Sequence, residues 1–275
     1  SFGWVSDYNA VELSGAKPVL ADVDDSMNLN PEDFKRKITK RTKAVIVIYY
    51  QGAASRVDEI VKIARKHGIK VIEDVAQAIG GSYENKKLGN WGDVAIFSLQ
   101  HNKIITTGDG GAFATNDQEF YERAVRYHDL GNIRPRFKDK LEKDIITKPF
   151  PGCQFRMNEL TGAVALAQIR KLPQMLKTVK KYSDKVREAL KKEFPDIKLR
   201  DVKPQNDLGI VIEIDLGNEE RKNMFRKAYQ AEGLMYGATS GCGTLTIFEA
   251  VVESLKERGE FREKDFAKSK EIEGK

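Results

Sequence analysis

The sequence has few of the features on which several protein classes depend. Two cysteines in 275 residues, Cys153 and Cys242, are too few for a disulfide framework and lack metal-ligand spacing. No apolar run approaches the roughly 18 residues that a membrane helix requires. These absences predict a cytoplasmic protein with no metal site and no membrane partner. The sequence also lacks an initiator Met, and it starts and stops inside apparent structural units, so we expect it to be a fragment without its N-terminal start and C-terminal end.

The charge balance is the one feature that suggests a nucleic-acid partner. The net charge is +6, from 47 Lys and Arg against 41 Asp and Glu. The basic residues are interleaved with acidic ones along helical patterns, which is typical of solvated helix faces and not of a basic stripe with aromatic residues. We therefore expect no nucleic-acid partner. As an alternative, the positive charge could attract a phosphorylated or nucleotide-bearing substrate.

Short apolar runs alternate with amphipathic helical patterns in the first half of the sequence. We predict strands at residues 18–23, 43–50, 70–74, 94–98 and 111–115. One helix is predicted to begin with Asn30 as its N-cap and Pro31 in its first turn, and another is predicted over residues 57–67. Strand, helix and strand in this order predict an α/β fold with a mostly parallel sheet flanked by helices.

The second half is predicted to be mainly helical. The expected helices are 117–129, 158–171, 176–194 and 219–233, with a basic loop at 134–152 and a strand at 209–215. We predict a large domain over residues 1–178, truncated at its N-terminus, and a smaller, truncated α+β domain over residues 179–275.

Lys103 lies in the most informative segment. A predicted strand ends at Ser98, and a short loop carries Lys103 into a turn with glycines at 108, 110 and 111. Glycine permits positive φ and a close approach of the backbone to a ligand. A lysine held on such a loop can be desolvated, which lowers its pKa and makes the amine a nucleophile towards an aldehyde. Taken alone, the segment also fits a surface lysine beside a hairpin turn.

Asp74 is predicted at the carboxyl end of an apolar parallel strand, at residues 70–74. Ligands bind at this edge in open α/β sheets. An aspartate there can keep the pyridine nitrogen of pyridoxal phosphate protonated, so that the ring accepts electrons. The alternative for the residue alone is a helix cap or a loop aspartate.

Together the two segments resemble the DegT/StrS-type sugar aminotransferases, which have the fold-type-I aminotransferase architecture. The family pattern Glu-Asp-x-Ala-Gln-Ala is present at residues 73–78, and its Ser, Lys and Gly-Asp-Gly-Gly elements follow at residues 98–111. Residues 1–4, 15–24 and 156–163 match further family segments. The resemblance covers roughly residues 1–235 and says little about the substrate.

The resemblance implies roles for the matching residues. Lys103 would bind pyridoxal 5'-phosphate through a Schiff base and would then act as general base. Asp74 would pair with the pyridine nitrogen, and Gln77 would lie near the phenolic oxygen. Ser98 would donate to the phosphate.

Trp4 and Gln154 are the remaining site residues that the resemblance implies. Trp4 would stack on the cofactor ring, with a core aromatic as the alternative. Gln154 replaces the family's frequent Asn, which reaches the phosphate of the neighbouring subunit. Residues 49–52 replace a loop in which the family often has His.

The family's Gly-Thr phosphate loop would lie before residue 1. Residues 240–244 resemble it but are predicted to be a connection in the small domain.

The activity implied is transamination of a keto sugar, above all a nucleotide-linked one, or of a keto cyclitol, with glutamate or glutamine as amino donor. Sites in this family form between two subunits, so a homodimer is expected. Lys103 favours transamination over the dehydration performed by relatives that carry His there. Another pyridoxal-phosphate reaction and a non-catalytic regulator that binds the cofactor remain alternatives.

Overall fold

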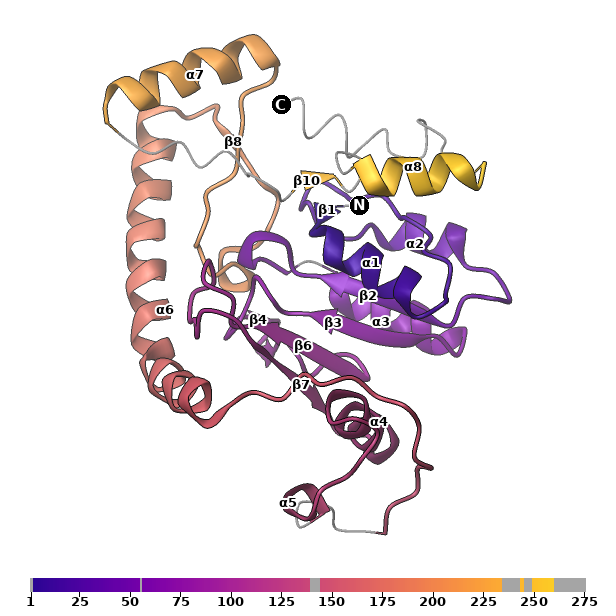
Figure 1. Ribbon diagram of the computed structural model, residues 1–275. Coiled ribbons are helices and arrows are strands. Elements are labelled where there is room, and N and C mark those ends of the chain that lie inside the picture. The colour runs from indigo at the N-terminus through magenta and orange to yellow at the C-terminus, as the bar shows by residue number, and fades with distance from the viewer. Residues whose placement is uncertain (1, 55, 139–143, 234–242, 245–248, 260–275) are drawn as a thin grey trace.

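A four-stranded sheet forms the centre of the molecule. The computed structural model describes residues 2–54, 56–138, 144–233, 243–244 and 249–259 (Figure 1). The strand order is β2–β3–β6–β7, with bounds Ala44–Ile48, Lys70–Asp74, Val94–Ser98 and Gly111–Thr115. The first three strands are parallel and β7 is antiparallel. This arrangement confirms the predicted α/β fold with a mostly parallel sheet.

The helix α3 (Val57–Lys66) covers one face of β2 and β3. Its apolar residues recur with the spacing of one helix face, and Ile60 and Ala64 are fully buried in a cluster with Val47 and Val71 of the strands. Gly68 has φ +66° directly after the helix, a conformation that glycine adopts without steric cost. The predicted helix at 57–67 is confirmed.

Short elements surround this core. In the first half they are β1 (Phe2–Gly3), α1 (Val5–Leu13), α2 (Pro31–Lys37), η1 (Tyr50–Gly52), β4 (Ser82–Tyr83) and β5 (Lys86–Lys87). Asn30 caps α2 by accepting from the backbone N–H groups of Glu32 and Asp33, as predicted. After the sheet come α4 (Gln118–His128) and α5 (Pro135–Lys138), which lies within the predicted loop.

The strand predicted at residues 18–23 is wrong. Only Val23 makes an isolated bridge there, to Leu29. Side chains of α2 satisfy the backbone instead: Asp33 Oδ2 accepts from the N–H of Asp22, and Lys37 Nζ donates to the carbonyl of Leu20. A segment whose polar groups are paired in this way needs no neighbouring strand.

The two helices predicted at 158–171 and 176–194 form one helix, α6 (Glu159–Glu193), which runs along one side of the sheet (Figure 1). Pro173 lies inside it, and its neighbours Leu172 and Leu176 pack against Leu99 and Ile105. Tertiary packing thus offsets the local cost of the proline. Although α6 has 35 residues, none of the helices in the described residues has both the length and the apolar character to cross a bilayer.

The C-terminal part contains β8 (Lys198–Leu199), η2 (Pro204–Asn206), β9 (Ile214–Asp215), α7 (Glu219–Ala231), β10 (Gly243–Thr244) and α8 (Glu249–Glu257). The strand predicted at 209–215 is reduced to β9, which pairs with β8. Residues 240–242 lie outside the described residues, whereas Gly243 and Thr244 pair with β1. The helix α8 packs on α1 through Val251, Leu255 and Tyr8.

Candidate functional site

The carboxyl ends of β2, β3 and β6 meet at one edge of the sheet, and Asp74 lies at the centre of that edge. It is the last residue of β3 and pairs in register with Ile48 on one side and Ile96 on the other. Its side chain is buried, with 6% of the residue exposed, and accepts a hydrogen bond of 2.9 Å from the backbone N–H of Ala76. The strand thus delivers a carboxylate to the edge where ligands bind in such sheets.

Lys103 lies on the loop between β6 and β7. The loop closes on Leu99, whose N–H donates to the carbonyl of Gly110 and whose carbonyl accepts from Thr107, both at 2.9 Å. Gly108 and Gly110 have φ of +85° and +134°, so the turn uses the freedom predicted for its glycines. Lys103 is half-buried, and its charge acts on the carboxyl groups of Asp74 and Asp7.

Asp7 is a member of this cluster that the sequence analysis missed. It is the third residue of α1, and only 9% of the residue is exposed. Its carboxyl group lies in hydrogen-bonding contact with that of Asp74. The sequence signal was ambiguous, because an acidic residue in the first turn of a helix is common and favourable wherever the helix lies.

Burial dominates the electrostatics of the two carboxyl groups. It raises the pKa of Asp7 to about 8, and the adjacent charge of Asp74 contributes in the same direction. Burial also raises the pKa of Asp74, while the Ala76 N–H, the Lys103 charge and the Asp7 hydrogen bond act to lower it. Two carboxyl groups in contact cannot both ionise readily, so the pair holds one proton near neutral pH.

Gln77 lies on the loop that follows β3, and Ser98 is the last residue of β6. Gln77 Oε1 accepts a 2.8 Å hydrogen bond from the backbone N–H of Gln51, which has φ +50°. Arg200 supports this turn by donating to the carbonyls of Tyr50 and Gln51, at 3.0 and 3.4 Å. Ser98 is half-buried at the end of β6, and its Oγ accepts from the N–H of Gln100 at 3.3 Å.

Trp4 is the N-cap residue of α1, one turn before Asp7, and 45% of it is exposed. It is therefore not a core aromatic, and its carbonyl accepts from the N–H of Asp7 at 3.1 Å. Trp4 thus lies one helical turn from Asp7, beside the carboxyl pair. Stacking on the cofactor stays a prediction.

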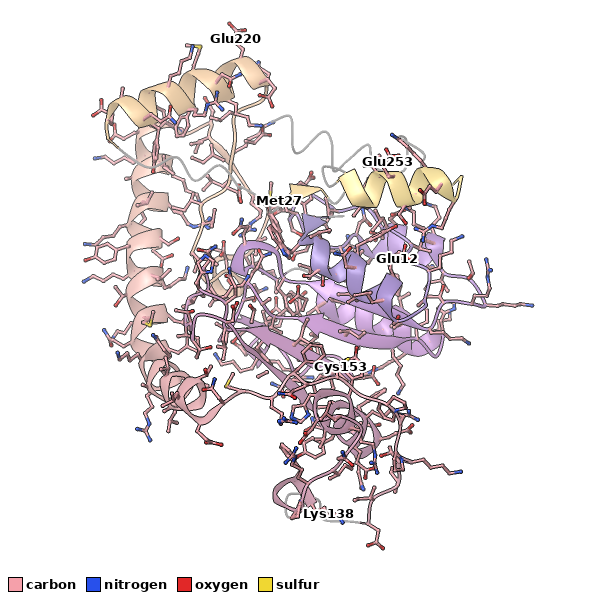
Figure 2. The ribbon with its side chains drawn as sticks, viewed as in Figure 1. Glu12, Met27, Lys138, Cys153, Glu220 and Glu253 are labelled. Atoms are coloured by element: carbon pink, nitrogen blue, oxygen red, sulfur yellow. The ribbon has the colours of Figure 1, made fainter. Side chains whose placement is uncertain are left out.

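Gln154 lies apart from this cluster, in a cavity of about 640 Å³ lined by Arg134, Arg156 and neighbouring residues. The backbone of Gln154 forms an isolated antiparallel β-bridge with that of Asp129. The adjacent Cys153, labelled in Figure 2, donates its N–H to the carbonyl of Tyr127 of α4. Arg134 and Arg156 pair with Asp129, and the hydrogen bond from Arg134 is the main cause of the lowered pKa of Asp129. Gln154 is exposed, as a contact with a second subunit requires.

Comparison with known proteins places these residues in a family. The model of the DegT/DnrJ/EryC1/StrS aminotransferase family matches residues 1–235. Two curated relatives are GDP-perosamine synthases. The one from Escherichia coli O157:H7 is 31% identical over 66% of this chain and 48% of its own length. The one from Caulobacter vibrioides is 36% identical over 64% of this chain and 46% of its own length. The chain thus spans about half the length of these relatives.

A solved structure supports the architecture. The aminotransferase from Psychrobacter cryohalolentis matches with a TM-score of 0.83 at 22% identity, over 99% of this chain and 72% of that one. It confirms the predicted fold-type-I architecture. Pyridoxal 5'-phosphate is the cofactor of the family, which confirms the cofactor expected from the sequence.

The residues at the sheet edge fit this cofactor. The cofactor needs an amine for its aldehyde and an acid for its basic ring nitrogen. The half-buried Lys103 and the buried Asp74 at the end of a parallel strand provide these two groups. Asp7 Oδ2 is buried, and no donor among the described residues hydrogen-bonds to it. A buried acceptor left without a donor marks a place where a proton, or a protonated group, belongs.

Proposed function

The chain belongs to the DegT/DnrJ/EryC1/StrS aminotransferase family, and from this premise we propose that it performs pyridoxal-phosphate-dependent transamination of a keto sugar. The observation that carries the proposal is the position of Lys103. Its charge acts on Asp74 and Asp7 at the carboxyl edge of the sheet, so an amine and a buried acid are available at one place. A regulator that only binds the cofactor could keep both groups, so the half-reaction with an amino donor has to distinguish it from an enzyme.

Each residue has a distinct task in the proposed reaction. Lys103 would hold the cofactor through its aldehyde, and its amine would act as the base that moves a proton to and from the substrate carbon. Asp74 holds a proton on the ring nitrogen. The cofactor, when bound, supplies an electron sink for the charge that develops on that carbon. Ser98 would donate to the phosphate, Gln77 would lie beside the ring, and Trp4 would cover one of its faces.

The names of the curated relatives guide the choice of substrate. Both are called GDP-perosamine synthase, and perosamine is an amino sugar, so we propose a nucleotide-linked keto sugar as amino acceptor. The net charge of +6 favours approach of an anionic nucleotide sugar. Glutamate or glutamine is the proposed amino donor.

An absorbance spectrum of the protein at its natural length, mixed with pyridoxal phosphate, tests the proposal. We expect the band of the lysine-bound cofactor to appear and to bleach when glutamate is added. Lys103→Ala should remove the band, while a variant of a lysine outside the site, Lys62→Ala on α3, should keep it. A band that persists in Lys103→Ala excludes the assigned lysine. A band that forms but never bleaches, with either donor, favours the cofactor-binding regulator.

We also propose a homodimer with shared active sites. Apolar side chains are exposed on and just before the first half of α6: Phe155 (64%), Leu160 (82%), Val164 (46%), Leu166 (52%) and Ile169 (53%). Exposed apolar surface of this extent marks an interaction site. Light scattering should give the mass of a dimer, and Leu160→Glu should shift the equilibrium towards the monomer. A monomeric wild-type protein at micromolar concentration contradicts the dimer.

The domain division and the location are proposals as well. The boundary between residues 1–178 and 179–275 falls inside α6, and the β8–β9 ribbon and α7 follow it. Limited proteolysis after residue 193 tests whether the two parts separate. A cytoplasmic location is consistent with the low cysteine content.

A further inference from the structure

Asp7 is held against the site from three directions. Its helix begins beside Trp4, whose backbone N–H donates to the Asp7 carboxyl group. A Cβ built on Gly3 would lie 3.4 Å from Asp7 Oδ2 and 2.6 Å from Ile48 Cδ1, so β1 and the end of β2 enclose the carboxyl group. Asp74 of β3 lies on the remaining side. The carboxyl group of Asp7 thus connects the backbone of Trp4 to the carboxyl group of Asp74.

The hydrogen bonds around the two carboxyl groups indicate which of them carries the shared proton. Asp74 in its ionised form receives the Ala76 N–H at 2.9 Å, and Lys103 also lowers its pKa. Asp7 receives only the Trp4 N–H, and Lys103 is the smallest of the influences on it. No donor among the described residues hydrogen-bonds to Oδ2 of Asp7. Among the described residues, Asp74 and Lys103 are the titratable groups whose charges act on Asp7. The shared proton therefore belongs on Asp7, whose Oδ2 has no donor, in its contact with Asp74.

We propose that Asp7 is a positioning residue of the cofactor site, whose carboxyl group donates a hydrogen bond to Asp74 and leaves Asp74 as the one negative charge that faces the ring nitrogen. The inference rests on the proposed function for the identity of the ring, but the carboxyl pair exists without it. Because Asp7 also contacts the backbone of Trp4, it fixes the distance between the two residues proposed to hold the ring.

Infrared spectroscopy of the protein without cofactor at pH 7 tests the proton assignment. A protonated carboxyl group has a carbonyl stretch that a carboxylate lacks. We expect the Asp7→Asn variant to lose one such band. Glu12→Gln, on the same helix (Figure 2), should keep it, because Glu12 is paired with Arg258. The difference spectrum is needed because burial also raises the pKa of Glu213. Identical spectra of wild type and Asp7→Asn overturn the proposal.

The affinity for pyridoxal phosphate tests the positioning role. In Asp7→Asn the amide can still donate to Asp74 and accept from Trp4, so the dissociation constant should stay within about threefold. Asp7→Ala removes the donor and should weaken binding at least about tenfold, the size expected for a hydrogen bond to a charged group. Equal affinity in Asp7→Ala and wild type overturns the role.

The outcomes separate this inference from the proposed function. If the infrared band is present but no lysine-bound cofactor forms, the proposed function fails and the carboxyl pair stands. If the absorbance band forms normally and the infrared band is absent, the function stands and Asp7 is ionised, against the inference.

Discussion

Glu73 and Asp74 are consecutive buried acids on β3, yet their surroundings differ in kind. Successive strand residues point to opposite faces of the sheet. Glu73 accepts from the Tyr49 hydroxyl at 2.6 Å and from the backbone N–H groups of Gly89, Trp91 and Gly92 at 2.6–2.7 Å. Asp74 receives one backbone N–H and otherwise faces Asp7 and Lys103. A saturated carboxylate stabilises a loop, and an incompletely paired one is available for chemistry.

The largest expected effect is that of Asp74→Asn on turnover. An amide cannot hold a proton on the ring nitrogen, so kcat should fall about 1000-fold while the cofactor still binds through Lys103. Stability should change little or increase, because the neutral amide removes a buried charge. Steady-state kinetics and thermal unfolding measure the two effects. An unchanged kcat removes Asp74 from the mechanism.

Glu73→Gln should show the opposite profile. An amide presents one oxygen where the carboxylate serves four donors, so buried N–H groups lose their partner and the free energy of unfolding should fall by ~3 kcal/mol. Denaturant unfolding measures this loss. The cofactor's absorbance should remain that of wild type in the folded variant. If Glu73→Gln lowers kcat as strongly as Asp74→Asn without loss of stability, the contrast between the two residues is wrong.

The pH dependence of stability tests whether Asp7, the neighbour of Asp74, is protonated in the folded chain. Burial raises the pKa of Asp7 to about 8 in the folded chain, against about 3.9 in an unfolded one. The folded state therefore binds the extra proton between these values, and its stability falls as pH rises, by ~1.4 kcal/mol per pH unit between about pH 5 and 7.

Asp7→Asn cannot titrate and should lack this slope. Unfolding of wild type and variant at several pH values in this interval gives the difference directly. The Glu12→Gln variant serves as control, because the pKa of Glu12 is lowered, mainly by its hydrogen bond with Arg258, and Glu12 does not titrate in this interval. Parallel curves for wild type and Asp7→Asn contradict a protonated Asp7.

The sequence predicted the parts of the fold that local patterns determine. The strands at 70–74, 94–98 and 111–115 and the Asn30 cap agree with the structure because apolar runs and capping chemistry act over a few residues. The strand expected at residues 18–23 failed because the pairing of its backbone depends on side chains of α2, 10 or more residues away. The break expected near Pro173 failed because packing of α6 outweighs the proline.

The site follows the same division. Lys103 and Asp74 could be singled out as candidates because Asp74 ends one buried strand and Lys103 follows the next, in motifs with fixed spacing. Asp7 could not, because an aspartate in a first helical turn acquires its meaning only from β3, which lies more than sixty residues later in the chain. Tertiary contacts between distant segments set the charge state of a site, and no local pattern encodes them.

Gln154→Ala should have the smallest effect. It tests whether the cavity around Gln154 contributes to cofactor binding in addition to the residues at the sheet edge. Gln154 is exposed, so stability should not change, and affinity for pyridoxal phosphate should fall about two- to fivefold if its amide reaches the phosphate of a neighbouring subunit. Gln230→Ala, an exposed glutamine on α7, is the matched control. The decisive comparison adds Leu160→Glu. In that dimer-deficient background Gln154→Ala should have no further effect, because the contact requires two subunits. An effect of equal size in both backgrounds places Gln154 in a site of its own subunit.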